Sequence, residues 1–416
     1  MVYSQYWPSR KAFSVRKIVI SGLLTLVALA VAGGNTPPTA AASTGRLASQ
    51  QAQTPVTAFI ISGRISCGTP TSCLGLGETL KSGKLAQVVE VWNGTAWRSV
   101  AVPTPNPTVA NIDLAGVSCK SATSCVVVGS YLTLAGAGTE RPYALTWNGK
   151  SLTPTATPPV PTGGGFASLT GVSCITTTNS CVAVGPSRGG AGPLMVEIWN
   201  GAKWTLQTAT IPGGAASTYP GAVSCHFLTF CVVAGESYSS TGAPSMLLAR
   251  WNGKGLTLMK PAVPAGAANV TLNDVSCPST TLCAVAAFST TTAGTNTFGF
   301  AEIWNGTSWR ADTVAAPKGG AELYGISCRP DGTCVAAGSE GPSGAAKATA
   351  LSYNGKTWTA ENVPAPATGT SSYFFGVNCL RPSPCVAFGQ ITAARPAAVT
   401  PVGGLWNGSS WRLVAA

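Results

Sequence analysis

Short apolar runs alternate with polar turns along almost the whole chain. Runs of Val, Ile and Ala are bounded by Gly, Pro, Ser and Thr, and no segment keeps an apolar period of 3.6 residues. This pattern is typical of strands and tight turns rather than of amphipathic helices. The 49 glycines and 30 prolines agree with a chain that turns often. The sequence therefore predicts an all-β protein.

Fourteen cysteines divide this pattern into repeated units of nearly constant length. They form seven pairs; six pairs enclose five residues, one encloses six, and successive pairs begin 51 to 55 residues apart. A period of this length is typical of propellers and repeat arrays. The pairs are Cys67 and Cys73, Cys119 and Cys125, Cys174 and Cys181, Cys225 and Cys231, Cys277 and Cys283, Cys328 and Cys334, and Cys379 and Cys385.

A Trp-Asn-Gly phrase, or a close variant of it, follows each pair, as in VWNGTAW and LWNGSSW. Asn-Gly predicts a hairpin, because a type I′ turn needs positive φ at both central residues. Each unit then holds four strands: one ends at the first cysteine, one begins at the second, one ends at the aromatic residue before Asn-Gly, and one follows. Seven such antiparallel units over residues 59–416 predict a seven-bladed β-propeller, with a solenoid or two sandwiches as alternatives.

The cysteines of a pair flank a short polar loop, so they should lie opposite each other across the first hairpin of their blade. Cα separations there suit a disulfide. We expect one disulfide per blade, each worth about 2 kcal/mol. Metal binding is the rival interpretation. The spacing is not Cys-x2-Cys and the chain has one histidine, His226, so we expect no metal site and no cofactor.

The unit resembles the kelch repeat, in which a glycine ends strand two, an aromatic residue lies in strand three and a tryptophan opens strand four. The matching positions are Gly129, Trp147 and Leu152 in the second unit and Gly338, Tyr353 and Trp358 in the sixth. The NGTSW phrase is similar to the Asp-box repeat of sialidase-like propellers, with asparagine in place of aspartate. The cysteine-paired form looks like secreted propellers of actinobacteria. These resemblances imply a fold rather than a chemistry.

Residues 1–42 differ from the repeats. Four basic residues precede the apolar run IVISGLLTLVALAVA, and small residues follow it, which is the order of a secretory signal peptide. The run is shorter than the ~20 residues of a spanning helix. We expect cleavage, with retention as a membrane anchor as the alternative. Residues 43–58 then form a linker, and the protein is expected to be secreted or held at the cell surface.

Charge is scarce, at 9% of residues, and the net charge is +12. The turns of the cysteine hairpins and the Asn-Gly hairpins share one face, and Asp331 is their one acidic residue. Such a basic face would suit an anionic wall polymer, and the alternative is a set of solvated turn residues. Basic residues are not interleaved with aromatic ones, so nucleic acid is not expected. The basic residues are Lys120, Lys150, Lys203, Lys254, Arg329, Lys356 and Arg381.

Candidate binding residues lie at the opposite end of the first strand of each unit. The position six residues before the first cysteine should open this strand at the mouth of the channel, and in units two to seven it holds Asp113, Ser168, Tyr219, Thr271, Glu322 and Tyr373. Three residues before the cysteine, Arg64 and Asp274 replace the Gly or Ala of the other units. These two charges are expected to face the channel or to make a structural polar contact.

The long loops between strands two and three and between units gather on the face opposite the cysteine hairpins. The leading hypothesis is a secreted, monomeric binding propeller that recognises an extracellular carbohydrate or protein through this long-loop face. A glycan hydrolase or lyase is the first alternative, with Asp113 and Glu322 as its carboxylates. A catalytic pair must lie ~5 to 9.5 Å apart, whereas these two belong to blades nearly across the ring, so no catalytic residue is assigned. A structural protein held in the wall by its basic face is the second alternative. Ligand identity, oligomeric state and ring closure stay open.

Overall fold

A computed structural model describes residues 59–81, 84–105, 109–133, 139–160, 165–210, 215–291, 297–313, 320–342, 345–366, 371–380, 384–394 and 397–415. The predicted signal peptide and linker lie outside the described residues. Across the described ranges, none of the helical segments is long and apolar enough to cross a membrane.

The described residues form seven sheets of four antiparallel strands, and each sheet takes consecutive strands of the chain. The first blade contains β1 (Phe59–Thr69), β2 (Ser72–Lys81), β3 (Lys84–Trp92) and β4 (Trp97–Ala101). The second contains β5 (Val109–Ser121), β6 (Ser124–Thr133), β7 (Thr139–Trp147) and β8 (Leu152–Thr155). The third contains β9 (Gly171–Cys174), β10 (Cys181–Gly185), the short 3-10 helix η2 (Arg188–Gly190), β11 (Leu194–Trp199) and β12 (Trp204–Ala209).

The remaining blades repeat the same order. The fourth contains β13 (Ser217–Phe227), β14 (Phe230–Tyr238), β15 (Pro244–Trp251) and β16 (Leu256–Leu258). The fifth contains β17 (Ala267–Ser276), β18 (Cys283–Thr291), β19 (Thr297–Trp304) and β20 (Trp309–Thr313). The sixth contains β21 (Ala321–Cys328), β22 (Cys334–Glu340), β23 (Lys347–Tyr353) and β24 (Trp358–Glu361). The seventh contains β25 (Ser371–Cys379), β26 (Cys385–Ala394), β27 (Ala397–Trp406) and β28 (Trp411–Ala415).

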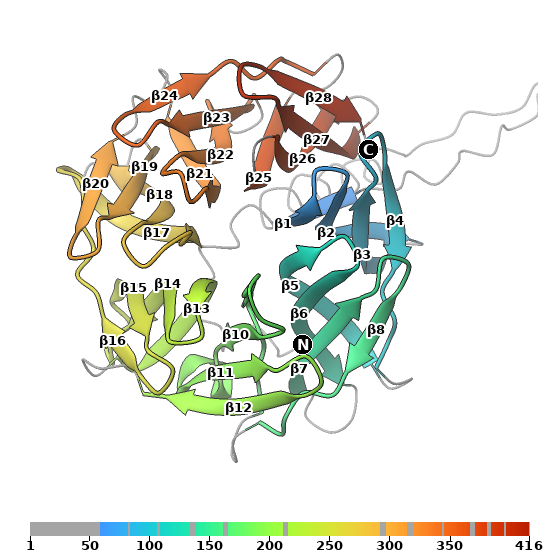
Figure 1. The fold of residues 1–416 in the computed structure, drawn as a ribbon, viewed down its shortest axis with the longest axis vertical. Coiled ribbons are helices and arrows are strands. Elements are labelled where there is room, and N and C mark those ends of the chain that lie inside the picture. The colour runs from blue at the N-terminus through green and yellow to red at the C-terminus, as the bar shows by residue number, and fades with distance from the viewer. Residues whose placement is uncertain are drawn as a thin grey trace, which may run out of the picture. The chain divides into compact units, whose positions relative to one another are not determined.

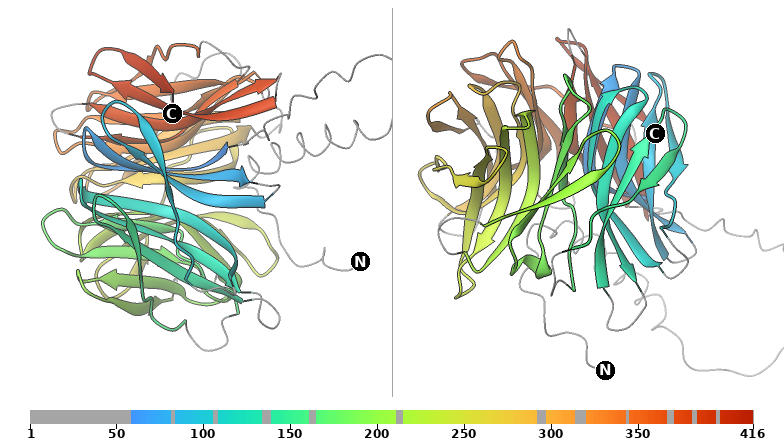
Figure 2. Two further views of the ribbon diagram at one scale, coloured as in Figure 1. Left: turned by 90° about the vertical axis from the view of Figure 1, so that its right-hand side faces the viewer. Right: turned by 60° about the horizontal axis from the view of Figure 1, so that its bottom comes forward.

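The sheets stand in a ring with the first strand of each blade innermost (Figure 1). Seen from the side, the strands run between the two faces of the ring (Figure 2). The predicted seven-bladed β-propeller is therefore confirmed.

Each blade carries its predicted disulfide across the first hairpin. In the first blade Cys67 stands opposite Cys73 in the β1–β2 ladder. The seven bridges have Cα–Cα distances between 3.9 and 4.1 Å. Each bridge joins neighbouring strands of one blade, so the disulfides staple hairpins and do not join blades.

The Asn-Gly turns differ from the predicted type I′ turn. In the loop between β3 and β4, Gly94 has positive φ (98°) and Asn93 does not. Instead, the Asn93 side chain accepts the backbone N–H groups of Thr95 at 2.9 Å and Ala96 at 2.8 Å. The prediction of two positive φ angles was wrong, because the asparagine acts through its side-chain oxygen. The Asn-Gly loops of the other six blades make the same pair of bonds.

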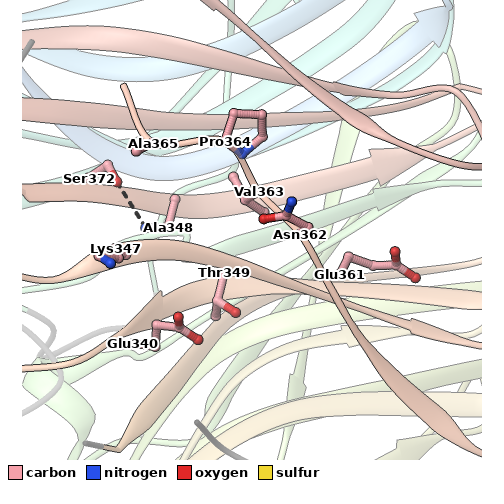
Figure 3. A pocket seen from close by; sticks show the side chains of 10 residues that line it. All are labelled: Glu340, Lys347, Ala348, Thr349, Glu361, Asn362, Val363, Pro364, Ala365 and Ser372. Atoms are coloured by element: carbon pink, nitrogen blue, oxygen red, sulfur yellow. Dashed lines mark hydrogen bonds between the residues drawn. The ribbon is translucent and has the colours of Figure 1, made fainter. Parts of the chain in front are cut away.

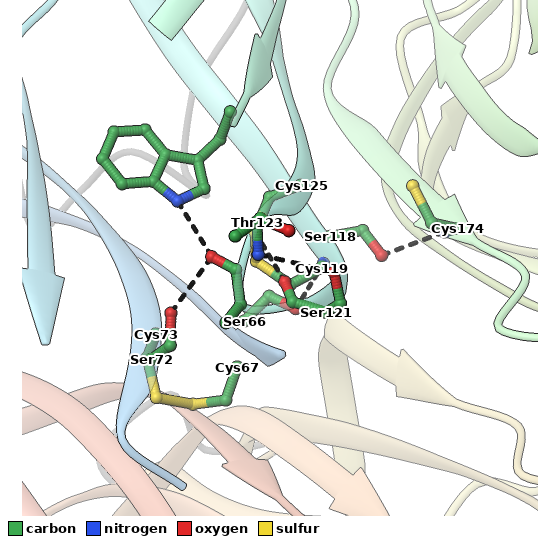
Figure 4. Close-up of a disulfide and its surroundings, with 12 residues drawn as sticks. Ser66, Cys67, Ser72, Cys73, Ser118, Cys119, Ser121, Thr123, Cys125 and Cys174 are labelled. Atoms are coloured by element: carbon green, nitrogen blue, oxygen red, sulfur yellow. Dashed lines mark hydrogen bonds between the residues drawn. A yellow bond between two sulfur atoms is a disulfide. The ribbon is translucent and has the colours of Figure 1, made fainter. Parts of the chain in front are cut away.

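Hydrogen bonds join each blade to the next beside the cysteines. The N–H of Cys119 donates to Ser66 Oγ of the preceding blade at 2.9 Å (Figure 4). The N–H of Cys174 donates likewise to Ser118 Oγ at 2.9 Å. We call the seven acceptors the serine ladder: Ser66, Ser118, Ser173, Ser224, Ser276, Ser327 and Asn378. A residue that the repeat places before every first cysteine thus holds the ring together at its centre.

The ring closes between the seventh and first blades without exchanging a strand. Strand β1 contacts β25, β26 and β27 directly. Here the ladder uses Asn378, whose Oδ1 accepts the N–H of Cys67 at 3.2 Å. The buried ring of Phe388 packs on Gly75, where an added Cβ would lie 2.6 Å from that ring, and on Trp97 with ring centroids 4.6 Å apart. Complementary packing and the asparagine therefore close the ring.

Candidate functional site

The channel has two chemically different ends. The first strand of a blade runs toward its disulfide, so the disulfide hairpins gather at one end, which we call the cysteine end. The starts of the first and third strands and the ends of the second and fourth strands gather at the other end, which we call the mouth. The candidate binding residues six positions before the cysteines lie on the mouth side.

An ion pair crosses the channel between these ends. Arg64 of the first blade donates from Nη1 to Asp274 Oδ1 of the fifth blade at 2.8 Å. Its Nη2 donates to the carbonyl oxygens of Gly221 at 2.6 Å and Asn273 at 3.1 Å. Both charged side chains keep about a fifth to a quarter of their surface in contact with solvent, at 24% and 21%. The arginine therefore ties together the first, fourth and fifth blades.

Asp274 is held from the other side by backbone donors. The N–H of Val275 donates to Oδ1 at 3.0 Å, and the N–H of Ile326, in the sixth blade, donates to Oδ2 at 3.0 Å. Burial raises the pKa of Asp274, while the Arg64 guanidinium and these two N–H groups oppose the rise. The two side chains use their polar atoms on each other and on the backbone. This geometry favours a structural contact, and a binding role for either residue stays a prediction.

Small residues make the channel narrow at the level of the ion pair. Arg64 and Asp274 occupy a ring of equivalent positions that is otherwise glycine or alanine. At Gly325 an added Cβ would lie 2.7 Å from the Cα of Gly376 in the next blade, so a side chain there would push two inner strands apart. The cavity beside the pair measures about 70 Å³. It has room for a few water molecules, and a larger ligand has to stay at the mouth.

Aromatic side chains gather at the mouth on the inner strands of the sixth and seventh blades. Tyr373 stacks on Phe375 with ring centroids 5.7 Å apart and planes 3° apart. Tyr324 lies 5.4 Å from Phe375 and donates its hydroxyl to the Glu322 carboxylate. Burial and the Glu322 carboxylate raise the pKa of Tyr324 above its usual value. We call Glu322, Tyr324, Tyr373 and Phe375 the aromatic platform.

The platform brings two predicted residues together with two that the sequence interpretation missed. Glu322 and Tyr373 were predicted, whereas Tyr324 and Phe375 were not. The missed pair sits four residues before the cysteine, at a β-bulge in both blades. A bulge adds a residue to one strand and turns its side chain in a direction that simple alternation does not give. The available signal was the appearance of Tyr and Phe at a position that is Gly, Ala, Thr or Asn in the other blades.

A second tyrosine cluster lies on the fourth blade. Tyr219 stands opposite Glu236 in the β13–β14 ladder and meets Tyr238 edge to face, with ring centroids 5.8 Å apart. The Tyr238 hydroxyl donates to Glu236 at 2.7 Å, and the Tyr219 hydroxyl donates to the Gly189 carbonyl of the third blade at 2.6 Å. Next to Gly189, the exposed Arg188 has a left-handed backbone with φ of 52°. Tyr219 is thus fixed at the mouth by the third blade and by Tyr238.

The remaining predicted mouth residues do not join either cluster. Asp113 is half-buried opposite Ser130 in the second blade, and Ser168 and Thr271 are half-buried in the third and fifth blades. Asp113 and Glu322 belong to the second and sixth blades, so three blades separate them on one side of the ring and two on the other. Their proposed action as a catalytic pair stays a prediction.

A polar pocket opens on the mouth side between the sixth and seventh blades (Figure 3). Its volume is about 280 Å³. The ends of β22 and β24 supply Glu340 and Glu361, the start of β23 supplies Lys347, and the start of β25 supplies Ser372. The segment that follows β24 adds apolar walls, including Val363 and Pro364. We call this the blade 6–7 pocket.

Three carboxyl groups are buried inside the blades rather than at the mouth. Burial raises the pKa of Glu90, although a hydrogen bond from Ser99 opposes the rise. Burial also raises the pKa of Glu197 to about 8, and neither of its oxygens has a partner among the described residues. For Glu302 burial raises the pKa to about 7, and the N–H of Ala262 partly offsets this. These side chains belong to the packing between blades.

The cysteine end carries exposed lysines, but the predicted basic face needs one correction. Lys150, Lys203, Lys254 and Lys356 are exposed and Lys120 is half-buried. Arg329, in contrast, is 9% exposed. Its Nε donates to the Leu380 carbonyl oxygen at 3.0 Å, so the side chain joins the sixth and seventh blades and is not part of an exposed basic face. Arg381 lies outside the described residues.

The described ranges contain no cluster of side chains that could hold a metal ion. No three His, Cys, Asp or Glu residues are grouped there as ligands. The fourteen cysteines are all disulfide-bonded. His226 lies at the cysteine end of β13 with its ring 4.2 Å from that of the exposed Phe227. So many disulfides indicate that the protein folds in an oxidising compartment.

Fold and disulfides together define a seven-bladed β-propeller stapled once in every blade. The chain is similar to the β-propeller domain of the trilobed protease from Pyrococcus furiosus, at 7% identity and a TM-score of 0.48, with 86% of this chain and 97% of that chain covered. A mutant of Aleuria aurantia lectin in complex with alpha-methyl-L-fucoside gives 10% identity, a TM-score of 0.38 and coverages of 86% and 97%. Phage phi92 endosialidase is 10% identical with a TM-score of 0.44, and the match covers 82% of this chain and 63% of that chain.

These likenesses concern the fold alone, because the identities are so low. No protein-family model and no curated protein matches the chain. The resemblance to kelch and Asp-box repeats, and the actinobacterial origin, stay predictions.

Proposed function

We propose that this protein is a binding protein for extracellular glycans and that it holds them at the mouth of its channel. The observation that carries this proposal is the aromatic platform. A half-buried tyrosine ring, Tyr373, is backed by a buried ring, Phe375, which is 8% exposed. The apolar face of a sugar ring stacks on such a surface with little loss of side-chain entropy.

Polar groups beside the rings suit hydroxyl groups. The Glu322 carboxylate has acceptor capacity beyond the bond from Tyr324, since an ionised carboxylate accepts about four hydrogen bonds. Across the mouth, Tyr219 and Glu236 offer the same pairing of an aromatic ring with a carboxylate. A few fixed polar groups next to apolar surface are typical of small-molecule sites.

The narrow channel limits how a ligand is held. Arg64 and Asp274 cross the channel, and the cavity beside them measures about 70 Å³. A sugar chain therefore lies over the mouth and does not pass through the ring. Glycans at the cell surface are within reach if residues 1–42 direct export, which is the role we propose for that segment.

The test is a glycan array probed with the oxidised protein. Tyr373→Ala should weaken binding at least tenfold, because it removes the half-buried ring on which the sugar is proposed to stack. Lys254→Ser, at the cysteine end, is the matched control and should bind as the parent does. Binding lost in Lys254→Ser and kept in Tyr373→Ala would instead support attachment to an anionic wall polymer. If the protein bound peptides and no glycan, the ligand would be a protein and the glycan proposal would be wrong.

The hydrolase or lyase alternative is tested in the same assay. Turnover of a bound glycan that disappears in Glu322→Gln, while affinity is kept, would assign catalysis to the mouth.

A further inference from the structure

The blade 6–7 pocket and the aromatic platform share one strand. Ser372 and Tyr373 are neighbours near the start of β25, and successive side chains of a strand point to opposite faces of its sheet. Ser372 faces the sixth blade, where its Oγ accepts the N–H of Ala348 at 2.9 Å. Ser372 is 4% exposed and forms a wall of the pocket. Tyr373 of the platform points to the other face of the same strand, so a ligand has to pass over the start of β25 to touch both.

The charges that line the pocket do not balance. Glu340 stands opposite Lys347 in the β22–β23 ladder, so the one cation of the lining lies on the strand next to Glu340. Glu361 accepts the hydroxyl of Ser352, which is a neutral donor. Figure 3 shows Glu340 and Glu361 on either side of Thr349, with Lys347 on the side of Glu340. The lining therefore carries one negative charge without a matching positive one.

The size of the pocket admits one residue of a chain. At about 280 Å³ it lies at the lower end of the ~300 to 1,000 Å³ typical of ligand pockets. Val363, Pro364 and Ala365 give it an apolar wall, while Asn362 and Thr349 add neutral polar groups. A single six-membered sugar ring has both the dimensions and the mixture of polar and apolar surface that this lining fits.

We propose that the blade 6–7 pocket is a subsite for an amine-bearing sugar residue, a hexosamine unit with its amine directed at Glu361. The neighbouring residues of the same glycan chain then reach the aromatic platform. This inference rests on the proposed glycan binding and adds the chemical class of the ligand. A protonated amine supplies the missing positive charge, and a charge-assisted hydrogen bond is roughly twice as strong as a neutral one.

The experiment compares three tetrasaccharides of equal length by calorimetric titration at pH 6. One is built of glucosamine with free amines, one of N-acetylglucosamine and one of glucose. The glucosamine tetramer should bind the parent protein about tenfold more tightly than the other two, as expected from one charge-assisted bond. Glu361→Gln, which keeps an acceptor for Ser352, should remove this preference and change the affinity for the other two less than twofold.

Asp312→Asn is the matched control. Asp312 pairs with Arg310 on the outer strand of the fifth blade, so its loss removes one carboxylate away from the pocket. It should leave the preference unchanged. Equal binding of the three tetramers, or an equal loss for all three in Glu361→Gln, would overturn the subsite. If Tyr373→Ala still abolishes binding in that case, glycan binding at the mouth survives; if it has no effect on any glycan, the proposed function fails as well.

Discussion

The two ends of the channel are built from the same seven strands, yet they repeat very differently. At the cysteine end, six blades place a serine before the first cysteine, and each bonds to the next blade at 2.9 Å. At the mouth, the residue six positions before that cysteine changes from blade to blade. Closing a ring of equal blades needs the same contact each time, whereas a site needs different groups. The repeated contact gives the cysteine end a structural role, and recognition at the mouth is our proposal.

Reduction of the disulfides is expected to have the largest effect, and it acts at the cysteine end. Each bridge closes a short loop and contributes about 2 kcal/mol, so the loss of all seven should unfold the blades at moderate temperature. Thermal unfolding with and without reductant measures this. An unchanged unfolding midpoint would show that the disulfides do not stabilise the hairpins.

Two buried carboxyl groups, which lie at neither end of the channel, should make the folded protein less stable as the pH rises. Burial raises the pKa of Glu197 to about 8 and that of Glu302 to about 7, above the ~4.3 of an unfolded chain. Between the unfolded pKa and the folded pKa of each group, the unfolded chain has released a proton that the folded protein keeps. The contribution of these groups to stability is therefore fully present below about pH 4.3 and is lost as the pH rises toward 8.

Glu197→Gln should therefore raise the free energy of unfolding at pH 8 by on the order of 4 kcal/mol and have little effect at pH 4. Chemical denaturation at the two pH values gives both numbers. A variant that is equally stabilised or destabilised at both would show that Glu197 does not titrate on unfolding in this range.

The ion pair between the two ends provides the next test. Asp274→Ala leaves the Arg64 charge and two backbone N–H groups without their acceptor, and should cost about 2 kcal/mol. Replacing both side chains by the glycine that most other blades carry removes the unmatched charge and should cost less than the single change. A double variant that loses the sum of both single losses would argue against the pairing.

The closing contact of the ladder should give the smallest of these losses. Asn378→Ala removes the acceptor of the Cys67 N–H and should cost about 1 kcal/mol. Asn378→Ser is the matched variant, because serine is the acceptor at the other six contacts of the ladder. Its shorter side chain tests whether the seventh contact needs the length of asparagine. Equal stability of parent and Asn378→Ala in chemical denaturation would show that packing alone closes the ring.

The sequence predicted what repeats and missed what depends on the ring. Cysteine pairs recur every 51 to 55 residues and Asn-Gly phrases every 49 to 55, so blade number, strand order and disulfides followed from spacing. The contact of Arg64 with Asp274 joins positions 210 residues apart, and no local pattern reports such a contact. The serine ladder was visible as a recurring residue, but its role needs the distance between neighbouring blades.

Two local interpretations failed for local reasons. Asn93 was assigned by a turn rule that concerns backbone angles, whereas its side chain forms the loop. Arg329 was assigned to a solvated face by its place in a turn, whereas the seventh blade covers it. At the mouth, the bulges at Tyr324 and Phe375 shift the alternation of side chains, so only half of the aromatic platform could be predicted.

The most direct test measures glycan affinity and the unfolding midpoint on the same preparations of Tyr373→Ala and Asn378→Ala. We predict a crossed result: Tyr373→Ala loses affinity at least tenfold and keeps its midpoint, whereas Asn378→Ala loses stability and keeps its affinity within twofold. Affinity that falls only together with the midpoint in both variants would contradict the division of roles between the mouth and the cysteine end.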